Sequence, residues 1–152
     1  MKRIGVISDT HGQLRPEVIK RLDGSDLIIH AGDVGADGII GRLEQIAPVK
    51  VVRGNVDYGA WASKFPLTEA LELEGVAIFI YHGHLDLDID PVKGGFKVII
   101  SGHSHIPKLE EKEGILYLNP GSCGPKRFSR PVSMARLELA DGNARAELIP
   151  LE

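Results

Sequence analysis

The sequence predicts an α/β protein, a four-layer α/β/β/α sandwich in which two mixed β-sheets pack face to face and are flanked by helices. Apolar, β-branched runs recur along the chain. Helical segments separate the first three runs, and glycine-containing turns follow the later ones. The chain has 152 residues, of which 43% are hydrophobic, enough to fill one core. Because no linker or repeat divides it, we expect residues 1–152 to form a single domain.

The first half of the chain alternates buried strands with helices, which we expect at residues 4–7, 16–22, 27–29, 39–46 and 49–52. Pro16 suits the first turn of the first helix, and Pro48 follows the second helix. Strands that alternate with helices in this way are typical of a parallel sheet.

The second half changes to strand-like stretches joined by glycine turns, at residues 68–73, 76–80, 98–100, 108–112, 115–118, 131–139 and 144–149. The last two are expected to pair as a hairpin across Asp141 and Gly142. We therefore predict that this half is mostly antiparallel. Residues 85–95 contain three aspartates and Pro91 with little periodicity, so we expect a loop there with at most a short helix.

Polar side chains with metal-binding chemistry follow five of the apolar strands. They are Asp9 with His11, Asp33, Asn55, His82 with His84, and His103 with His105. In parallel sheets, ligands bind beyond the carboxyl ends of the strands. Residues two apart in an extended stretch point to the same side, so the D-x-H pair and the second H-x-H pair can each face one centre. A glycine beside each group lets the backbone turn sharply there.

Each of these residues taken alone could have an ordinary structural role. Asp9, Asp33 and Asn55 are singly more often helix caps or turn residues than ligands. A histidine such as His82 after a strand is as often structural as metal-binding. Five of the six histidines of the chain nevertheless fall in these groups. Their joint occurrence therefore favours a metal centre.

The available donor atoms narrow the choice of metal. A mixture of imidazoles and carboxylates with one amide suits Mn²⁺, Fe²⁺, Zn²⁺, Co²⁺ or Ni²⁺ better than Ca²⁺ or Mg²⁺, and we expect Mn²⁺. The single cysteine, Cys123, excludes an internal disulfide and a cysteine-rich zinc site. Nothing near Cys123 indicates an activated thiol, so we expect an inert packing residue.

The motifs D-x-H, G-D, G-N-x-D, H-G-H and G-H-S-H, in this order, resemble those of the calcineurin-like metallophosphoesterases, in particular their small bacterial and archaeal phosphodiesterases. The resemblance runs from Asp9 to the turn Asn119-Pro120-Gly121-Ser122. It implies a metallophosphoesterase-like fold and two divalent transition-metal ions. It also implies hydrolysis of phosphodiesters or activated phosphoesters by a hydroxide that bridges the two cations.

The same resemblance assigns the metal ligands. It implies that one ion is held by Asp9, His11, Asp33 and His105, and the second by Asp33, Asn55, His82 and His103. Asp33 would then bridge the two ions. Two cations roughly 3.5 to 4 Å apart can activate water and hold the phosphate oxygens during in-line attack.

The sequence departs from the family pattern at Val56. Many relatives carry histidine there, in a G-N-H-E or G-N-H-D motif, and valine cannot donate a proton. We therefore expect a preference for diesters or activated aryl esters over alkyl monoesters. His84 is the candidate to replace the missing acid, with the alternative that it orients a ligand. Asp57 is expected to orient Asn55 or its own turn rather than act as an acid.

Several residues near these motifs could serve in either of two ways. His30 is expected to be buried or to support a ligand. Three cations flank the turns, Arg53, Lys126 and Arg127, and each either neutralises phosphate charge or is a solvated surface residue. Three aromatic residues follow the G-N turn, Tyr58, Trp61 and Phe65, and they either stack on a nucleobase or pack the fold.

The charge balance limits the partners. With 18 basic and 21 acidic residues the net charge is −3, and no basic run is present. We therefore expect a small-molecule phosphoester substrate and no stable nucleic-acid complex. The apolar run near Met1 is too short for a signal peptide or a membrane span, so we expect a cytoplasmic protein without membrane contact. Self-association stays open, and the rival functions are a protein-interaction scaffold on the same fold and a metal-dependent nuclease.

Overall fold

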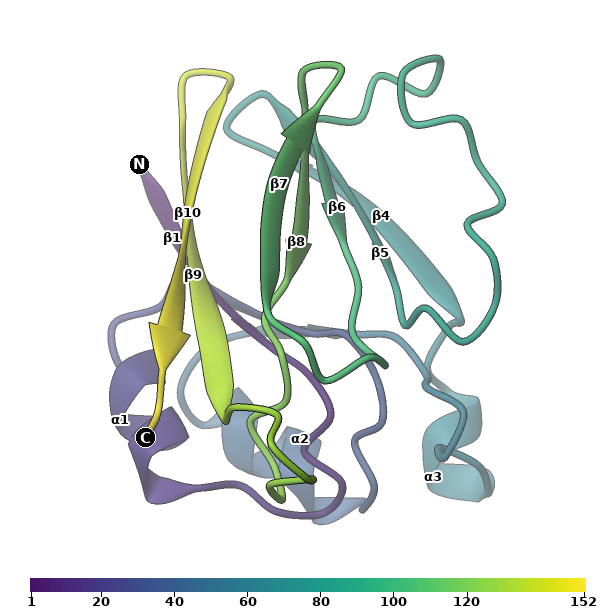
Figure 1. The fold of residues 1–152 in the computed structure, drawn as a ribbon, viewed down its shortest axis with the longest axis vertical. Coiled ribbons are helices and arrows are strands. Elements are labelled where there is room, and N and C mark those ends of the chain that lie inside the picture. Colours follow the sequence, from purple (N-terminus) through teal and green to yellow (C-terminus); the bar gives the residue numbers. More distant parts are fainter.

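The computed structural model describes residues 1–152 and contains two five-stranded β-sheets that pack face to face (Figure 1). The first sheet has the strands β1 (Lys2–Ile7), β2 (Leu27–His30), β3 (Val49–Val51), β9 (Ser133–Ala140) and β10 (Asn143–Pro150), in the order β10-β9-β1-β2-β3. The second sheet has β4 (Thr68–Leu73), β5 (Val76–Tyr81), β6 (Val98–Ile100), β7 (Lys108–Lys112) and β8 (Ile115–Asn119), in the order β4-β5-β6-β8-β7.

Both sheets are mixed, as predicted. In the first sheet β1, β2 and β3 are parallel, and β9 and β10 add to β1 in antiparallel fashion. In the second sheet β4 and β7 are antiparallel edge strands, but β5, β6 and β8 in the middle are parallel to one another. The expectation of a mostly antiparallel second half is therefore wrong for these three strands. Strands buried on both faces are typical of parallel pairing, and all three residues of β6 are buried.

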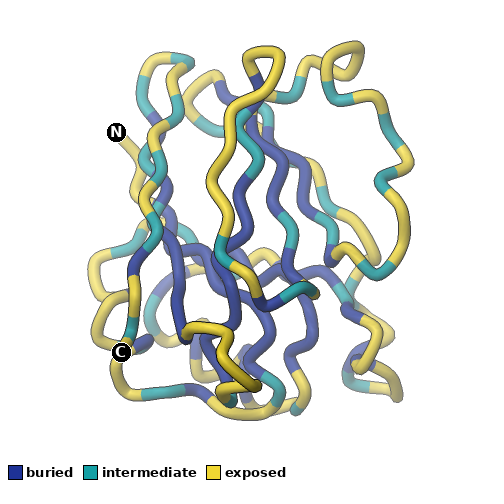
Figure 2. The backbone as a smooth tube through the Cα atoms, viewed as in Figure 1, coloured by how far each residue is buried: buried dark blue, intermediate teal, exposed yellow.

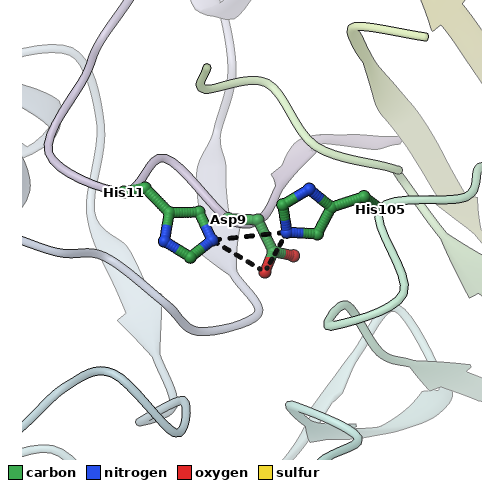
Figure 3. A group of neighbouring side chains, drawn as sticks. All are labelled: Asp9, His11 and His105. Atoms are coloured by element: carbon green, nitrogen blue, oxygen red, sulfur yellow. Dashed lines mark hydrogen bonds and ion pairs between the residues drawn. The ribbon is translucent and has the colours of Figure 1, made fainter. Parts of the chain in front are cut away.

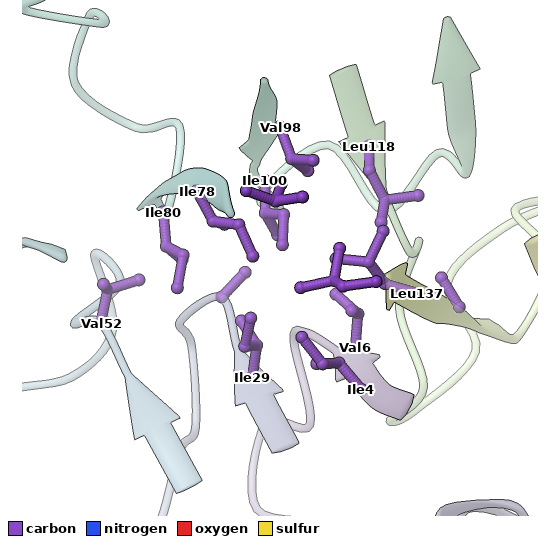
Figure 4. Packing of buried hydrophobic residues seen from close by; sticks show 14 residues of the cluster. Ile4, Val6, Ile29, Val52, Ile78, Ile80, Val98, Ile100, Leu118 and Leu137 are labelled. Carbon is purple, nitrogen blue, oxygen red and sulfur yellow. The ribbon is translucent and has the colours of Figure 1, made fainter. Parts of the chain in front are cut away.

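The main core lies between the two sheets (Figure 4). Ile4, Val6 and Ile29 of the first sheet face the second sheet, and Ile78 and Ile100 of the second face the first. All five side chains are fully buried. Burying an aliphatic side chain of this size stabilises the fold by about 1.5 to 3 kcal/mol. This core fixes the distance between the two sheets, and so between the polar residues that each sheet carries at its strand ends.

Two helices cover the outer face of the first sheet, α1 (Pro16–Leu22) and α2 (Gly38–Glu44). Their apolar residues, such as Val18 and Leu43, pack on strand residues that point away from the main core, such as Ile7 and Ile28. Both helices were predicted from their spacing, with α2 shorter than expected. A third helix, α3 (Ala60–Ser63), has only four residues, too few for helical periodicity to reveal it. None of the three helices is long and apolar enough to span a membrane.

A loop, and not the helical fourth layer that was predicted, covers the outer face of the second sheet. Leu87, Ile89 and Phe96 from this loop pack on Phe79 and Ile99 of the sheet. Residues 85–95 contain no helix, which agrees with the expected loop. Figure 1 shows this segment running outside β4 and β5. It does not reach β7, which is exposed along its whole length (Figure 2).

Candidate metal centre

The polar residues predicted from the strand ends converge in the structure. Asp9 and His11 follow β1, Asp33 follows β2 and Asn55 follows β3, whereas His82, His103 and His105 follow β5 and β6. Their ligand atoms form two groups, Asp9 with His11 and His105, and Asp33 with His82 and His103. Within each group all ligand atoms lie within 4.8 Å of one another. Both sheets therefore contribute to one cluster of donor atoms.

Five of the seven predicted ligands have left-handed backbone conformations, with φ of 57° at Asp9, 46° at His11, 55° at Asp33, 69° at His103 and 62° at His105. Residues other than glycine rarely adopt this region, and those that do cluster at functional sites. The D-x-H and H-x-H pairs thus do not approach the centre from extended stretches, so this part of the prediction was wrong. Tight turns bring both pairs to the centre. Backbone hydrogen bonds, such as the one from the Asp9 N–H to the Gly32 carbonyl (2.9 Å), hold these turns.

The first group is compact and largely buried (Figure 3). Asp9 Oδ1 lies 3.6 Å from His11 Nε2 and 3.3 Å from His105 Nε2. The two Nε2 atoms lie 3.3 Å apart. Three lone-pair donors around one point are the arrangement expected of transition-metal ligands.

The second group includes the amide of Asn55. Asp33 Oδ2 lies 3.2 Å from His82 Nε2. Asn55 Oδ1 lies 3.1 Å from His82 Nε2 and 3.1 Å from His103 Nδ1. This group thus offers one carboxylate, two imidazoles and one amide oxygen.

Asp33 lies between the two groups. Its Oδ2 atom is 3.2 Å from His82 Nε2 in one group and 3.6 Å from His11 Nε2 in the other. Its Oδ1 atom instead accepts the N–H of Val56 at 3.0 Å. Burial alone would raise the pKa of Asp33, but the contacts with His82 and Val56 lower it below its ordinary value. One oxygen of Asp33 is therefore held by the backbone while the other faces both groups.

Asp9 shows the same division between its two oxygens. Oδ2 accepts the Ser8 hydroxyl at 2.5 Å and the His103 N–H at 3.1 Å. Oδ1 is buried and has no hydrogen-bond donor. Burial would raise the pKa of this carboxyl, but the contacts with His105 and His11 outweigh it, so the pKa is held well below its usual range. A buried carboxylate oxygen without a donor is costly unless a cation compensates it. The residues present therefore fit a metal ion.

His82 is oriented by the backbone. Its Nδ1 lies 2.7 Å from the Ala31 carbonyl, which can only accept, so Nδ1 carries the proton and Nε2 faces the carboxylates. Burial opposes the charged imidazole, but Asp33 and Asp9 raise the pKa of His82 above its ordinary value. A metal ion bound at Nε2 would compete with that second proton.

Asp57 connects two of the turns. Its carboxylate accepts three backbone N–H groups, from Val34 at 3.1 Å, Gly35 at 3.0 Å and Gly54 at 3.0 Å. It thus ties the turn after β2, which carries Asp33, to the turn after β3. These contacts support the expected orienting role, because both oxygens of Asp57 are engaged.

His84 lies beside the second group of ligands. Its ring centroid is 5.4 Å from that of His82 and 6.3 Å from that of His103. Its Nδ1 is buried and has no partner. Burial, with the neighbouring His82 and His103, lowers the pKa of His84 below its ordinary value. The Val56 side chain is exposed and offers no proton.

The remaining candidates divide between packing and surface. His30 is fully buried, with Nε2 3.0 Å from the Thr10 hydroxyl. Cys123 is also fully buried, and burial raises the pKa of its thiol to about 12, as an inert packing residue requires. Trp61 and Phe65 pack against the core under α2, whereas Tyr58 is 79% exposed. Lys126 forms an ion pair with Glu152 at 2.8 Å.

Several residues that support the centre were not predicted. Ser8 donates to Asp9, and the Ser122 hydroxyl donates to the Asp9 carbonyl at 3.1 Å. Asn119 Nδ2 donates to the Gly102 carbonyl at 2.9 Å and so holds the G-H-S-H turn. The signal in the sequence was the N-P-G-S turn at the end of the family resemblance, which contains both Asn119 and Ser122.

Comparison with known proteins places the fold and the site in context. Residues 1–142 match the model of the calcineurin-like phosphoesterase superfamily domain. A probable metallophosphoesterase of Methanocaldococcus jannaschii is 37% identical over 162 residues, which cover 98% of this chain and 81% of that protein. The phosphodiesterase YfcE of Escherichia coli is 30% identical, covering 91% of this chain and 88% of that protein.

The solved structure of a protein that is not named a phosphoesterase shares the fold of this chain. Vps29 of Chaetomium thermophilum superposes with a TM-score of 0.80 over 99% of this chain and 97% of its own, at 19% sequence identity. At this level of identity the likeness concerns the fold alone. It confirms the predicted sandwich of two mixed sheets.

Proposed function

Because the chain belongs to the calcineurin-like phosphoesterase superfamily, we propose that it hydrolyses phosphodiesters or activated phosphoesters at a centre of two divalent cations. Its relatives are named metallophosphoesterases and phosphodiesterases, and the chain is accordingly a metal-dependent phosphoric ester hydrolase. The number of cations, the preferred ester and the residues that act on it belong to the proposal. That residues 1–152 act as a single domain is also part of the proposal.

The position of Asp33 Oδ2 is the observation that carries the proposal of two cations. This oxygen faces His11 in one ligand group and His82 in the other, at 3.6 and 3.2 Å. The Val56 N–H holds the second oxygen, so Asp33 is oriented for a bridging position. We assign one ion to Asp9, His11, Asp33 and His105, and the other to Asp33, Asn55, His82 and His103.

The chain's own residues set the geometry around the phosphate. When bound, the two cations would supply Lewis-acid activation of water and neutralise charge on the phosphate oxygens. The Ser8 hydroxyl and the His103 N–H orient Asp9, and the Ala31 carbonyl orients His82. Asp57 fixes the turns that carry Asp33 and Asn55. These contacts hold the donor atoms in place before substrate binds, which reduces the reorganisation needed in the transition state.

The preference for good leaving groups follows from Val56. Its side chain stands where a histidine would protonate the departing oxygen, and it has no proton to give. A leaving group of low pKa departs without that help, so aryl esters and diesters are favoured over alkyl monoesters. His84, whose ring lies next to those of His82 and His103, is proposed to supply part of what Val56 lacks, with the alternative that it orients a ligand.

The donor set favours a transition metal. Four imidazoles, two carboxylates and one amide oxygen suit Mn²⁺, Fe²⁺, Zn²⁺, Co²⁺ or Ni²⁺, and we propose Mn²⁺ as the working ion. The substrate is proposed to be a small-molecule phosphoester and not a stably bound nucleic acid, since the net charge is −3.

A protein-interaction scaffold is the second candidate function. The likeness to Vps29 in fold raises it. The complete set of donor atoms favours the enzyme, because a scaffold does not require seven converging ligands with one carboxylate oxygen of each aspartate left free of backbone donors.

The test combines metal content with activity. The purified chain should bind two equivalents of Mn²⁺ and hydrolyse bis(p-nitrophenyl) phosphate faster than alkyl monophosphates. Asp33→Ala and His103→Ala should reduce kcat by about a hundredfold or more, since each removes a ligand whose loss misplaces a cation. Asp23→Ala, an exposed carboxylate after α1, serves as the matched control and should leave both readouts unchanged. Binding of one equivalent, or faster cleavage of alkyl monoesters, would contradict the proposal.

A further inference from the structure

A cavity opens directly beside the proposed metal centre, on the outer face of the second sheet. It has a volume of about 440 Å³ and is lined at one end by His82, Gly83 and His84. Its floor is formed by Phe79 and Tyr81 of β5. We call it the His84 slot. The His82 side chain is fully buried and its Nε2 faces the carboxylates. The slot therefore borders the second group of ligands through His84, whose ring centroid lies 5.4 Å from that of His82 and 6.3 Å from that of His103.

The far end of the His84 slot is both apolar and acidic. Leu67, Leu85 and Leu87 line it together with Asp86 and Asp88, and no lysine or arginine does. Leu67 and Leu85 are 44% and 56% exposed, unusually open for leucines beside a polar centre. Such a wall suits an organic group and not a water-filled channel.

The two aspartates are free to meet a ligand. Neither Asp86 nor Asp88 makes a side-chain hydrogen bond or ion pair. Asp90 of the same loop, in contrast, accepts the N–H groups of Val92 and Lys93 and so serves its own turn. Asp86 and Asp88 therefore contribute negative charge to the slot that nothing in the chain neutralises.

A second cavity lies on the other side of Gly83 and differs in charge. It is also about 440 Å³, shares Tyr81 and Gly83 with the His84 slot, and has Lys108 and no acidic residue in its lining. Lys108 is paired with Glu110 at 2.9 Å. Of these two cavities, only the His84 slot has unpaired charge in its lining apart from its histidines, and that charge is negative.

We propose that the His84 slot binds one arm of a phosphodiester substrate, and that this arm is partly apolar and positively charged, as in an ester of an amino alcohol or a quaternary ammonium alcohol. The methylene and methyl groups of such an arm would pack on Leu85, Leu87 and the face of Tyr81, where a cation over an aromatic ring is stabilised. Asp86 and Asp88 would lie near the ammonium group. An arm that carries a further phosphate or carboxylate would be repelled.

This inference rests on the proposed function, because the phosphate must be held at the metal centre. It assigns the substrate class that the centre alone leaves open. It also gives His84 a role that needs no proton transfer, as the wall between the phosphate and the slot.

The experiment compares three p-nitrophenyl phosphodiesters that share a leaving group and differ in the other arm. The arms are choline, which is cationic, phenyl, which is neutral, and thymidine joined through its 5′-oxygen, which is neutral and polar. With the Mn²⁺-loaded protein, kcat/KM should be highest for the choline ester. In the variant with Asp86→Asn and Asp88→Asn it should fall about fivefold or more for that ester, through KM, because two exposed charge contacts are lost. It should change less than about twofold for the phenyl ester.

Controls separate charge from structure. Asp23→Asn removes an exposed carboxylate elsewhere and should leave the preference intact, and about 0.5 M salt should reduce it in the unmodified protein. An equal loss on all three esters in the double variant, or no preference for choline, would overturn the inference.

A binding measurement distinguishes its failure from that of the proposed function. Phosphorylcholine should bind the Mn²⁺-loaded protein more tightly than propyl phosphate by calorimetry, and the double variant should abolish the difference. If this holds while no diester is cleaved, only the proposed function fails. If diesters are cleaved but the two ligands bind equally, only the slot assignment is wrong.

Discussion

The backbone of Val56 contributes to the site, whereas its side chain has no proton to donate. Its N–H donates to Asp33 Oδ1 at 3.0 Å, a contact that any residue except proline can make. The side chain is 37% exposed at the edge of the centre. A substitution there can therefore add chemistry without disturbing the ligand Asp33.

Val56→His should improve hydrolysis of esters with poor leaving groups. A histidine there would protonate the departing oxygen, and general-acid assistance is typically worth about a hundredfold or more. We expect kcat for alkyl phosphodiesters to rise at least about tenfold, with little change for p-nitrophenyl esters. The ratio of the two rates measures the effect. Val56→Asn, polar but without a proton to transfer, should not reproduce the gain, and if it does, acid assistance is not the missing element.

His30 makes the fold sensitive to mild acid. Burial lowers the pKa of this histidine from 6.5 to about 4, and its Nδ1 accepts the Gly32 N–H at 3.1 Å. The unfolded chain takes up the proton near pH 6.5 and the folded chain resists it, so stability present above pH 6.5 is lost as the pH falls toward 4. The loss amounts to about 3 kcal/mol at most.

His30→Gln should reduce this pH dependence. The variant will be less stable near neutrality, because the Gly32 N–H loses its acceptor, but its unfolding free energy should change less between pH 6.5 and 4 than that of the unmodified protein. Urea unfolding at a series of pH values measures both slopes. Parallel slopes would show that another group is responsible. Asp9 and Asp33 are not expected to interfere, since their lowered pKa values place their effect below about pH 4.

At the scale of elements, the centre depends on how strands end. Gly54 follows β3 and lies against the turn of Asp33, and a Cβ at this position would overlap both Asp33 Oδ1 and the backbone nitrogen of Asp33. The second atom belongs to the backbone and cannot move aside easily. Glycine is thus required here by space, not by conformation.

Gly54→Ala should displace Asp33 and weaken metal binding. We expect the protein to remain folded, to bind less than two equivalents of Mn²⁺, and to lose most of its activity. Metal analysis and circular dichroism check these outcomes together. Gly41→Ala is the matched control, because a Cβ there meets nothing within 4 Å and lies inside α2, where alanine stabilises by about 0.5 to 1 kcal/mol. Full metal occupancy in Gly54→Ala would contradict the crowding argument.

The sequence revealed these elements to different degrees. Strands such as β6 were predicted within a residue, because an apolar, β-branched run bounded by turns is typical of a buried strand. The identity of the ligands followed from residue type. The left-handed turns at Asp9 and His103 did not, since spacing alone cannot distinguish a turn from an extended stretch. Nor could a run such as β8 show that its partner β6 is parallel, because strand partners depend on contacts distant in sequence.

At the scale of the molecule, the metal centre joins the two sheets. Asp9, His11, Asp33 and Asn55 come from the ends of strands in the first sheet, and His82, His103 and His105 from the second. A cation shared by both would act as a crosslink that the unfolded chain lacks. Metal binding and the stability of the whole sandwich are therefore linked.

Removal of metal should lower the melting temperature of the entire protein. At a metal concentration of about a hundred times Kd the stabilisation is about 2.7 kcal/mol, which corresponds to a shift of several degrees. Thermal unfolding with EDTA and with Mn²⁺ measures the shift, which should be much smaller in Asp33→Ala. Ca²⁺ at the same concentration is the control and should give little stabilisation, because the site is rich in imidazoles. An equal shift with Ca²⁺ would point to a general ionic effect.

The position of β1 also governs how the chain can fold as it is synthesised. β1 lies in the middle of its sheet between β2 and β9, and β9 begins only at Ser133. Until the ribosome has released that segment, the apolar strand with Ile4 and Val6 keeps one unpaired edge, which is a template for pairing with other chains. Chains that stop before β9 are thus expected to aggregate, although they contain every residue that we assign to the metal ions. The last hairpin, which carries none of these residues, closes the edge of the strand that leads into Asp9.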